Sequence, residues 1–289
     1  MIAVRIQGRL GNQLFQYAFA LSASKRLNTR FYVDQYIDHF TVNKYFKGID
    51  NNYFAFILKV FNLKGYKNFF TFYLRRAYFK DLQVVSQFAV RECDFEAKIS
   101  EITLQNNTLY QGFFQSELFF IDFEKLIRRK LVLKKGYVDL FNIKYGILYQ
   151  SHKIIAVHIR RTDYLNLGHL DLGGDDLSLP VEYYQKAISK FYDQDIHFVF
   201  ISDDKAFVNR NFEDIKNKTV TSDTEIMDFQ HLLNADGCII SNSTFSWWGA
   251  WLNNKKIKVI YGPKYFMGWR IKKETPPDIY PKDWVQIDF

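Results

Sequence analysis

Three predominantly apolar runs in the second half of the chain each end in polar side chains. They cover residues 154–159, 197–202 and 237–240, and a fourth run covers residues 258–263. In the first run, five of the six residues are aliphatic. Because these runs lack the apolar–polar alternation of a half-buried strand, they predict strands covered on both faces, as in parallel sheets.

Between these runs the apolar spacing becomes helical. Pro180 opens a predicted helix over residues 181–192, and another helix is expected to begin near Glu225. A β-α-β pattern also opens the chain, with a strand at 2–6, helical spacing after it and a strand at 31–34. Strands that alternate with helices favour an α/β fold, here with two Rossmann-like domains.

The domain boundary is expected where residues 137–150 cross from one layer to the next. We therefore predict a first domain over residues 1–150 and a second over 151–289. The last ~20 residues are expected to pack back on the first domain.

Polar groups gather at three of the predicted strand ends. Arg160 and Arg161 follow the first run, Asp203 and Asp204 follow the second, and residues 241–246 follow the third. Because ligands bind beyond the carboxyl ends of parallel strands, these groups predict a binding site there.

The two arginines favour an anionic ligand. A guanidinium group can grip phosphate with two hydrogen bonds, and a second cation nearby suits a diphosphate. An ion pair between Arg161 and Asp163 on a solvated rim is the alternative for these side chains. The hydroxyls and amides of residues 241–246 suit phosphate oxygens, although an ordinary helix N-cap would select the same residue types.

The first strand leads into a glycine turn, Gly8-Arg9-Leu10-Gly11-Asn12-Gln13. Free backbone N–H groups at the start of the following helix favour an anion. The glycines alone can be explained by the steric needs of a tight turn. With the polar residues Arg9 and Asn12 beside them, a ligand-binding turn is an equally good interpretation.

Residues 40–80 interleave lysine and arginine with aromatic residues. The segment suits a pair of helices that cover the first sheet, and contact with an anionic membrane surface is the alternative. Nucleic acid is not expected as a partner, because no nucleic-acid-binding module is recognisable.

The formal charge of +8 and a pI of about 9.2 also suggest acidic partners. Neither Cys93 nor Cys238 has metal-ligand spacing, and no signal peptide or membrane-spanning run is evident. A cytoplasmic protein is therefore expected, with any membrane contact peripheral, at the inner face.

Arg160, rather than a metal ion, is predicted to stabilise the negative charge of the departing diphosphate. The glycine turn is not a dinucleotide fingerprint, and no P-loop lysine motif occurs. Asp193-Gln194-Asp195 precedes a strand, so it is expected at the opposite edge of the sheet from the site. No cofactor and no metal are predicted.

Four motifs, in this order, resemble those of glycosyltransferase family 11, the α-1,2-fucosyltransferases. The resemblance runs from near residue 1 to about residue 265, and residues 40–100 carry no motif of the family. The motifs are the Gly8–Gln13 turn, His158-Ile159-Arg160-Arg161-Thr162-Asp163-Tyr164, Phe200-Ile201-Ser202-Asp203-Asp204 and the segment from Ser241 to Leu252.

The resemblance implies a GT-B fold in which two Rossmann-like domains face a central cleft. The first domain would hold the acceptor and the second would hold GDP-fucose. It also implies inverting transfer of L-fucose from GDP-β-L-fucose to the 2-hydroxyl of a terminal galactose in a glycan.

The same resemblance assigns roles to residues. Arg160 would grip the β-phosphate, His158 would lie near the guanosine and Asp228 would read the guanine edge. The catalytic residues expected are Arg160, Asp163 and His158. The substrate-binding residues expected are Arg9, Asn12, Arg161, Asp203, Asp228, Ser243, Thr244, Phe245 and Ser246, with Asn12 facing the fucose and Thr244 to Ser246 forming a phosphate turn.

One position departs from the pattern of related fucosyltransferases. The carboxylate that serves as base in the α-1,6 enzymes lies five residues beyond the motif aspartate, where this chain has Gly168. The base is then another group, or the reaction needs little base help. The candidates are Asp163, His169, Asp171 and Asp175.

Two other functions stay open on the sequence. One is a transferase of the same fold that uses another deoxy-sugar nucleotide. The other is a non-catalytic protein that binds glycans or polyanions through its basic aromatic segment.

Overall fold

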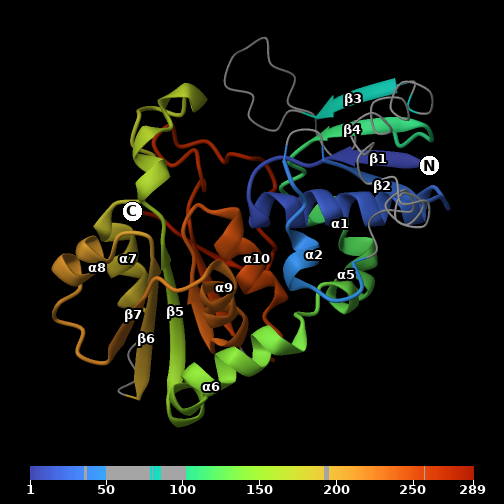
Figure 1. Ribbon diagram of the computed structural model, residues 1–289. Coiled ribbons are helices and arrows are strands. Elements are labelled where there is room, and N and C mark those ends of the chain that lie inside the picture. Colours follow the sequence, from blue (N-terminus) through green and yellow to red (C-terminus); the bar gives the residue numbers. More distant parts are fainter. Residues whose placement is uncertain (36–37, 50–78, 80, 86–101, 192–194, 257) are drawn as a thin grey trace. The chain divides into compact units, whose positions relative to one another are not determined.

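The structure, a computed structural model, describes the chain except residues 36–37, 50–78, 80, 86–101, 192–194 and 257. The chain forms two compact units, Met1–Val132 and Leu133–Phe289, each described here by itself (Figure 1). The boundary therefore lies near residue 132 rather than 150, because the helix that follows it belongs to the second unit.

The first unit contains a four-stranded parallel sheet with the order β2-β1-β4-β3. Its strands are β1 (Ile2–Arg5), β2 (Phe31–Asp34), β3 (Asp81–Val85) and β4 (Thr108–Gly112). Its helices are α1 (Leu10–Arg26), α2 (Val42–Tyr45) and α5 (Glu124–Lys130), with 3-10 turns at Glu117–Phe119 and Ile121–Phe123.

Helix α1 is fixed to this sheet on both its apolar and its polar side. The Phe19 ring stacks on the Phe114 ring at 3.8 Å between centroids. Gln16, fully buried, accepts from the Gln7 backbone N–H and donates to the Gly112 carbonyl. Since an unpaired buried amide would destabilise the fold, these two bonds explain a glutamine in the core.

The second unit contains a six-stranded parallel sheet with the order β10-β9-β8-β5-β6-β7. Its strands are β5 (Lys153–Ile159), β6 (Ile196–Ser202), β7 (Lys218–Thr221), β8 (Gly237–Ile239), β9 (Val259–Pro263) and β10 (Val285–Ile287). Its helices are α6 (Lys135–Ser151), α7 (Val181–Ile188), α8 (Lys205–Asn211), α9 (Glu225–Asn234) and α10 (Thr244–Leu252).

The predicted central strand is confirmed as β5, which pairs with both β6 and β8. Ile154 to Val157 are completely buried, as a strand covered on both faces requires. Gly249 allows α10 to lie close to α9, because a Cβ atom there would come within 2.5 Å of the Leu232 side chain. The motif around Trp247 and Trp248, both fully buried, is thus part of the core of this unit.

Four elements of the second unit were not predicted: α6, which was expected only as a crossing between the domains, and α8, β7 and β10. The residues of β7, Lys-Thr-Val-Thr, have little apolar character because this strand forms the edge of the sheet. The last strand, β10, pairs with β9, so these residues belong to the second unit; the expectation that the last residues also pack on the first domain stays a prediction.

In the basic aromatic segment, residues 40–80, the structure describes residues 40–49, which contain α2, and residue 79. The rest of that prediction lies outside the described residues. The same holds for Asp193 and Gln194 of the Asp-x-Asp sequence and for Cys93. Among the residues that are described, none belongs to a helix with the length and apolar character needed to cross a membrane.

Candidate active site

The second sheet reverses its strand order at β5. The chain runs from β5 to its neighbour β6 on one side, whereas β8 lies on the other side of β5. The loops that follow β5 and β8 therefore leave the same edge of the sheet in different directions. Such a switch point is where open α/β sheets bind their ligands.

A side-chain hydrogen bond joins the two strands at this point. His158, the penultimate residue of β5, has its Nδ1 atom 2.8 Å from Ser241 Oγ, just beyond β8. Burial holds the pKa of His158 at about 3, with the Arg160 charge lowering it further and Asp203 opposing. The imidazole is therefore neutral at physiological pH, and its ring lies 5.4 Å from the partly exposed Phe245 ring.

Arg160 is the first residue beyond β5, and two carboxylates orient its guanidinium. Its Nε donates to Asp163 Oδ1 at 2.7 Å, and its Nη1 lies 3.2 Å from Asp203 Oδ2. The side chain is 21% exposed. The alternative ion pair between Arg161 and Asp163 is not the one formed: Asp163 pairs with Arg160, because the chain turns into a 3-10 helix, Thr162–Asn166, rather than staying extended.

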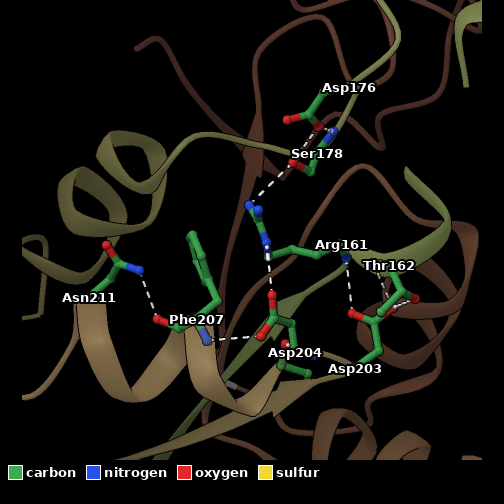
Figure 2. A network of polar contacts seen from close by, with 9 residues as sticks. Arg161, Thr162, Asp176, Ser178, Asp203, Asp204, Phe207 and Asn211 are labelled. Atoms are coloured by element: carbon green, nitrogen blue, oxygen red, sulfur yellow. Dashed lines mark hydrogen bonds and ion pairs between the residues drawn. The ribbon is translucent and has the colours of Figure 1, made fainter. Parts of the chain in front are cut away.

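Arg161 points into a different network, drawn in Figure 2. Its Nε donates to Asp204 Oδ2 and its Nη1 to Ser178 Oγ, both at 3.3 Å. Its guanidinium carbon lies 4.1 Å from the centre of the Phe207 ring on α8. These contacts connect the loop before α7 to the start of α8. Arg161 therefore has a structural role at the candidate site.

Asp203 organises the turn that carries both arginines. Its carboxylate accepts from the backbone N–H groups of Arg161 and Thr162, at 3.0 and 3.2 Å, and from Thr162 Oγ1 at 2.5 Å (Figure 2). With the Arg160 contact, it meets donors from three consecutive residues. Asp203 thus fixes the backbone of this turn and orients the Arg160 guanidinium.

The third strand end leads into α10 through Ser243. Although Ser243 is the N-cap residue, its side chain makes no capping hydrogen bond. The ordinary N-cap explanation therefore does not account for Ser243. The Ser246 hydroxyl donates to the Ser243 carbonyl at 3.0 Å, which fixes the turn that includes Thr244 and Phe245.

Tyr164 and Asn242 also belong to this site, although neither was among the individually predicted site residues. The Tyr164 hydroxyl donates to the Asn242 carbonyl at 3.1 Å, and Asn242 Nδ2 donates to the Leu177 carbonyl at 2.8 Å. These bonds connect the loop after β5 with the loop after β8. Both residues lie within the quoted motifs, and their place at strand ends was the available signal.

Asp228 lies in the first turn of α9 and is partly buried. Its Oδ1 atom accepts from Thr221 Oγ1 at 3.0 Å and from the Asp223 N–H at 3.1 Å. Burial raises the pKa of Asp228, against the lowering effect of these bonds. The next residue, Phe229, contacts the Phe245 ring at 5.3 Å, so α9 and the α10 turn are directly connected.

The base candidates occupy different surroundings. Asp163 contacts Arg160, whereas His169, Asp171 and Asp175 are exposed. Gly168 packs against Asp175, since a Cβ at residue 168 would come within 1.8 Å of Asp175 Oδ1. A carboxylate side chain at residue 168 would therefore require the exposed Asp175 side chain to move. Among the described residues, no group of three or more His, Cys, Asp or Glu side chains could hold a metal ion.

Arg9 and Asn12 belong to the first unit. Gly8 adopts φ of +76°, and its N–H donates to Asp38 Oδ2 at 2.7 Å. Asn12 Oδ1 accepts from Gln115 Nε2 at 3.0 Å, and Arg9 is the exposed N-cap residue of α1. This turn is therefore built at the carboxyl end of β1, as a ligand-binding turn would be.

Similarity to known proteins agrees with this architecture. Two Escherichia coli proteins match nearly the whole chain: an alpha-1,2-colitosyltransferase, 27% identical over all of this chain and 99% of its own, and the O-antigen biosynthesis glycosyltransferase WbnK, 26% identical over 98% and 99%. Solved structures of fucosyltransferases also match, and two of them are described here. They are NodZ alpha-1,6-fucosyltransferase soaked with GDP-fucose (14% identity, 87% of this chain and 92% of that one, TM-score 0.50) and POFUT1 in complex with GDP (12%, 90% and 97%, TM-score 0.52).

The predicted fold class is confirmed: the protein is an α/β protein with two Rossmann-like units of the GT-B type. The sequence family described as Glycosyl transferase family 11 matches residues 67–288, well over half of the chain. The protein is therefore a glycosyltransferase and a member of glycosyltransferase family 11.

Proposed function

We propose that this protein transfers L-fucose from GDP-β-L-fucose to the 2-hydroxyl of a terminal galactose, with inversion at the anomeric carbon. Family membership supports a glycosyl donor, and the related α-1,2-colitosyltransferase supports the 1,2 linkage. Membership in a transferase family also favours this function over the non-catalytic glycan-binding alternative.

The observation that carries the proposal is the position of Arg160 at the carboxyl end of the central strand. Two of its donor groups, Nε and Nη1, contact Asp163 and Asp203. A guanidinium has five N–H donors in a fixed plane, so further donors remain for phosphate oxygens. We assign them to the β-phosphate, whose negative charge grows as the C1–O bond breaks.

We assign the guanine and the phosphates to the surfaces around Phe245. The neutral His158 imidazole and the Phe245 ring would contact the guanosine, and the Asp228 carboxylate would accept from the guanine N–H groups. The turn formed by Thr244 and Ser246 would donate to phosphate oxygens at the start of α10. In the first unit, Arg9 and Asn12 would bind the fucose or the acceptor.

Asp163 is our candidate for the general base. It is exposed and restrained by Arg160, so an arriving diphosphate would compete for the guanidinium and release the carboxylate. The acceptor 2-hydroxyl would give its proton to Asp163 while its oxygen bonds to C1. The C1–O bond to GDP breaks at the same time, and its electron pair stays on the β-phosphate oxygen.

We also propose that the reaction needs no divalent metal ion, because Arg160 supplies the positive charge to the leaving group. Activity that survives a chelator would agree with this, and activity that is lost and then restored by Mg²⁺ or Mn²⁺ would contradict it.

The central experiment measures GDP release from GDP-fucose with β-galactoside acceptors. Arg160→Ala should lower kcat/KM by about 100- to 1,000-fold, as loss of a leaving-group donor does. Arg210→Ala removes an exposed arginine from the last turn of α8 and should leave turnover unchanged. Near-normal turnover of the Arg160 variant would contradict the assignment.

A second donor remains a specific alternative, since one relative is a colitosyltransferase. Colitose is fucose without its 3-hydroxyl, so the two donors share every group to which we assign the second unit's residues. Turnover of GDP-fucose and GDP-colitose side by side would decide between them. If UDP or dTDP raised the melting temperature more than GDP, both donors would be excluded.

A further inference from the structure

Helix α6 packs on the second unit through one face. The rings of Phe141, Tyr145 and Tyr149 lie 5.0, 4.4 and 5.8 Å from the ring of His231 on α9. The Tyr149 hydroxyl also lies 2.8 Å from His231 Nδ1. This aromatic face holds the helix to α9 and accounts for its place in the fold.

The opposite face of α6 carries aliphatic side chains in water. Leu140, Ile143 and Ile147 are 57%, 82% and 85% exposed. They are three and four residues apart, so they form one line along the helix. Single exposed aliphatic residues are ordinary, but an aligned set on a helix marks an interaction surface. We call this set the α6 stripe.

Basic residues surround the stripe. Lys135 and Lys144 lie on α6 with side chains 84% and 56% exposed, and Lys134 and Lys153 flank the helix at its two ends and are exposed too. Asp139 is the one acid in the helix, and its carboxylate lies 3.5 Å from Lys135. Asp223, just before α9, pairs with Lys144 at 2.5 Å, so four lysines against two carboxylates leave a net positive charge around the stripe.

This combination fits an anionic lipid surface better than a second copy of the chain. An antiparallel pair of α6 helices that matched the stripe to itself would bring Lys134, at one end of each helix, toward Lys153 at the other end of its partner, and like charges would oppose the contact. Aliphatic residues bordered by lysines are instead the pattern of a helix that lies in a membrane interface. Lysines near an anionic surface add attraction.

The place of α6 in the fold leaves the candidate active site free. The helix ends at Ser151 and leads at once into β5 at Lys153, whereas Arg160 follows the other end of that strand (Figure 1, where α6 is at the lower end of the second unit). A strand of this length separates the two by roughly 20 Å. A surface that contacts the stripe would therefore not cover Arg160.

We propose that the α6 stripe and its lysines dock the second unit on an anionic membrane surface. The helix would lie in the plane of the interface, with Leu140, Ile143 and Ile147 among the acyl chains and the lysines at the headgroups. This docking makes no use of residues 40–80 and does not depend on which sugar the enzyme transfers.

The test is sedimentation of the full chain with phosphatidylcholine vesicles, with or without phosphatidylglycerol. The wild type should bind the anionic vesicles and should be released as salt is raised. Ile143→Gln combined with Ile147→Gln should weaken binding at least about tenfold, because two aliphatic side chains lose their burial. Lys134→Gln combined with Lys135→Gln should weaken it about fivefold or more.

The matched control is Ile271→Gln, which replaces an exposed isoleucine elsewhere in the second unit and should leave vesicle binding unchanged. Circular dichroism and melting temperature should confirm that all variants fold, since the replaced side chains face solvent. The proposal would be overturned by a wild type that stays in the supernatant, or by a double isoleucine variant that binds like the wild type. A wild-type dimer in the absence of lipid that the double isoleucine substitution converts to monomer would assign the stripe to a second copy and also overturn it.

Discussion

The imidazole of His158 and the hydroxyl of Ser241 meet at 2.8 Å across the point where the second sheet reverses its strand order. His158 comes from β5 and Ser241 from the end of β8, so the bond joins the two strands whose loops form the candidate active site. Because His158 is almost completely buried, the bond lies beneath the surface that we assign to the guanosine. Because both groups are neutral, the bond fixes the conformation of that surface without placing a charge beneath it.

The first prediction concerns pH and stability. Burial is the main cause that lowers the pKa of both His158 and His231 from 6.5 to about 3. Below about pH 6.5 the unfolded chain therefore takes up protons that the folded chain does not bind, and stability falls with pH until about pH 3. Between pH 7 and pH 5, each histidine should lower the free energy of unfolding by about 2 kcal/mol.

Urea unfolding at the two pH values measures this effect. The difference in unfolding free energy between pH 7 and pH 5 should shrink by about 2 kcal/mol in His231→Gln. His169→Gln, which replaces an exposed histidine, should keep the full difference. A His231 variant with the wild-type pH dependence would show that this ring is not the group that titrates.

The second prediction concerns Asp203. Asp203→Asn removes the charge that faces Arg160 and leaves one amide oxygen to accept from Arg161, Thr162 and the Thr162 hydroxyl. Arg160 should then lose its fixed orientation, with kcat/KM for the donor falling about tenfold or more. The melting temperature should fall as well, since the donors of Arg161 and Thr162 lose an acceptor oxygen.

Asp204→Asn is the matched control for Asp203→Asn. Asp204 accepts from Arg161 Nε and from the Phe207 N–H at the start of α8, and no contact with Arg160 is involved. This substitution should lower stability with a smaller effect on kcat/KM. Equal effects of the two substitutions on kcat/KM would contradict a positioning role for Asp203.

The third prediction concerns the glycine turn of the first unit. Gly8 and Gly48 both have positive φ, at +76° and +59°, but a Cβ atom would meet Asn12 Nδ2 at 2.4 Å in the first case and nothing within 4 Å in the second. Alanine should cost about 1 kcal/mol of stability at either position, because of the backbone conformation. Gly8→Ala alone should also lower transfer activity, since it displaces Asn12 from Gln115. Equal activity of the two variants would argue against a role for Asn12.

The strand ends were predictable because they depend on local apolar runs. The run at 154–159 and the polar groups after it, Arg160 and Asp203, could be read from the sequence since a parallel sheet sends every strand end to one edge. The side-chain pairs formed at this edge could not be predicted from the sequence. Whether Asp163 meets Arg160 or Arg161 depends on a 3-10 turn that starts one residue after Arg161, and local spacing does not encode that turn.

Edge elements were missed for a related reason. Strand β7 pairs with β6 alone, and β10 pairs with β9 alone, so neither needs the apolar run that marks β5. The exposed aliphatic line of α6 was also invisible in the sequence, because helical spacing alone does not tell which of two apolar faces is buried. Only the contacts of Phe141, Tyr145 and Tyr149 with His231 decide that.

The last prediction separates the two adjacent arginines. Arg161 bonds Asp204 and Ser178 and lies over the Phe207 ring, so Arg161→Ala should lower the free energy of unfolding by about 1–3 kcal/mol. Arg160 is more peripheral to this network, and Arg160→Ala leaves Asp203 with its other three donors, so its effect on stability should be smaller.

The two variants should differ in the opposite order in their response to GDP: the more destabilised Arg161 variant should keep the rise in melting temperature that GDP causes. GDP should raise the melting temperature of the Arg161 variant, as in the wild type, because Arg160 is still available for the β-phosphate. The same GDP concentration should raise that of the Arg160 variant much less. Differential scanning fluorimetry with and without GDP measures both quantities in one experiment. If GDP stabilised the Arg160 variant fully and the Arg161 variant not at all, the phosphate would belong to Arg161, and the ion pairs of Arg160 with Asp163 and Asp203 would be structural.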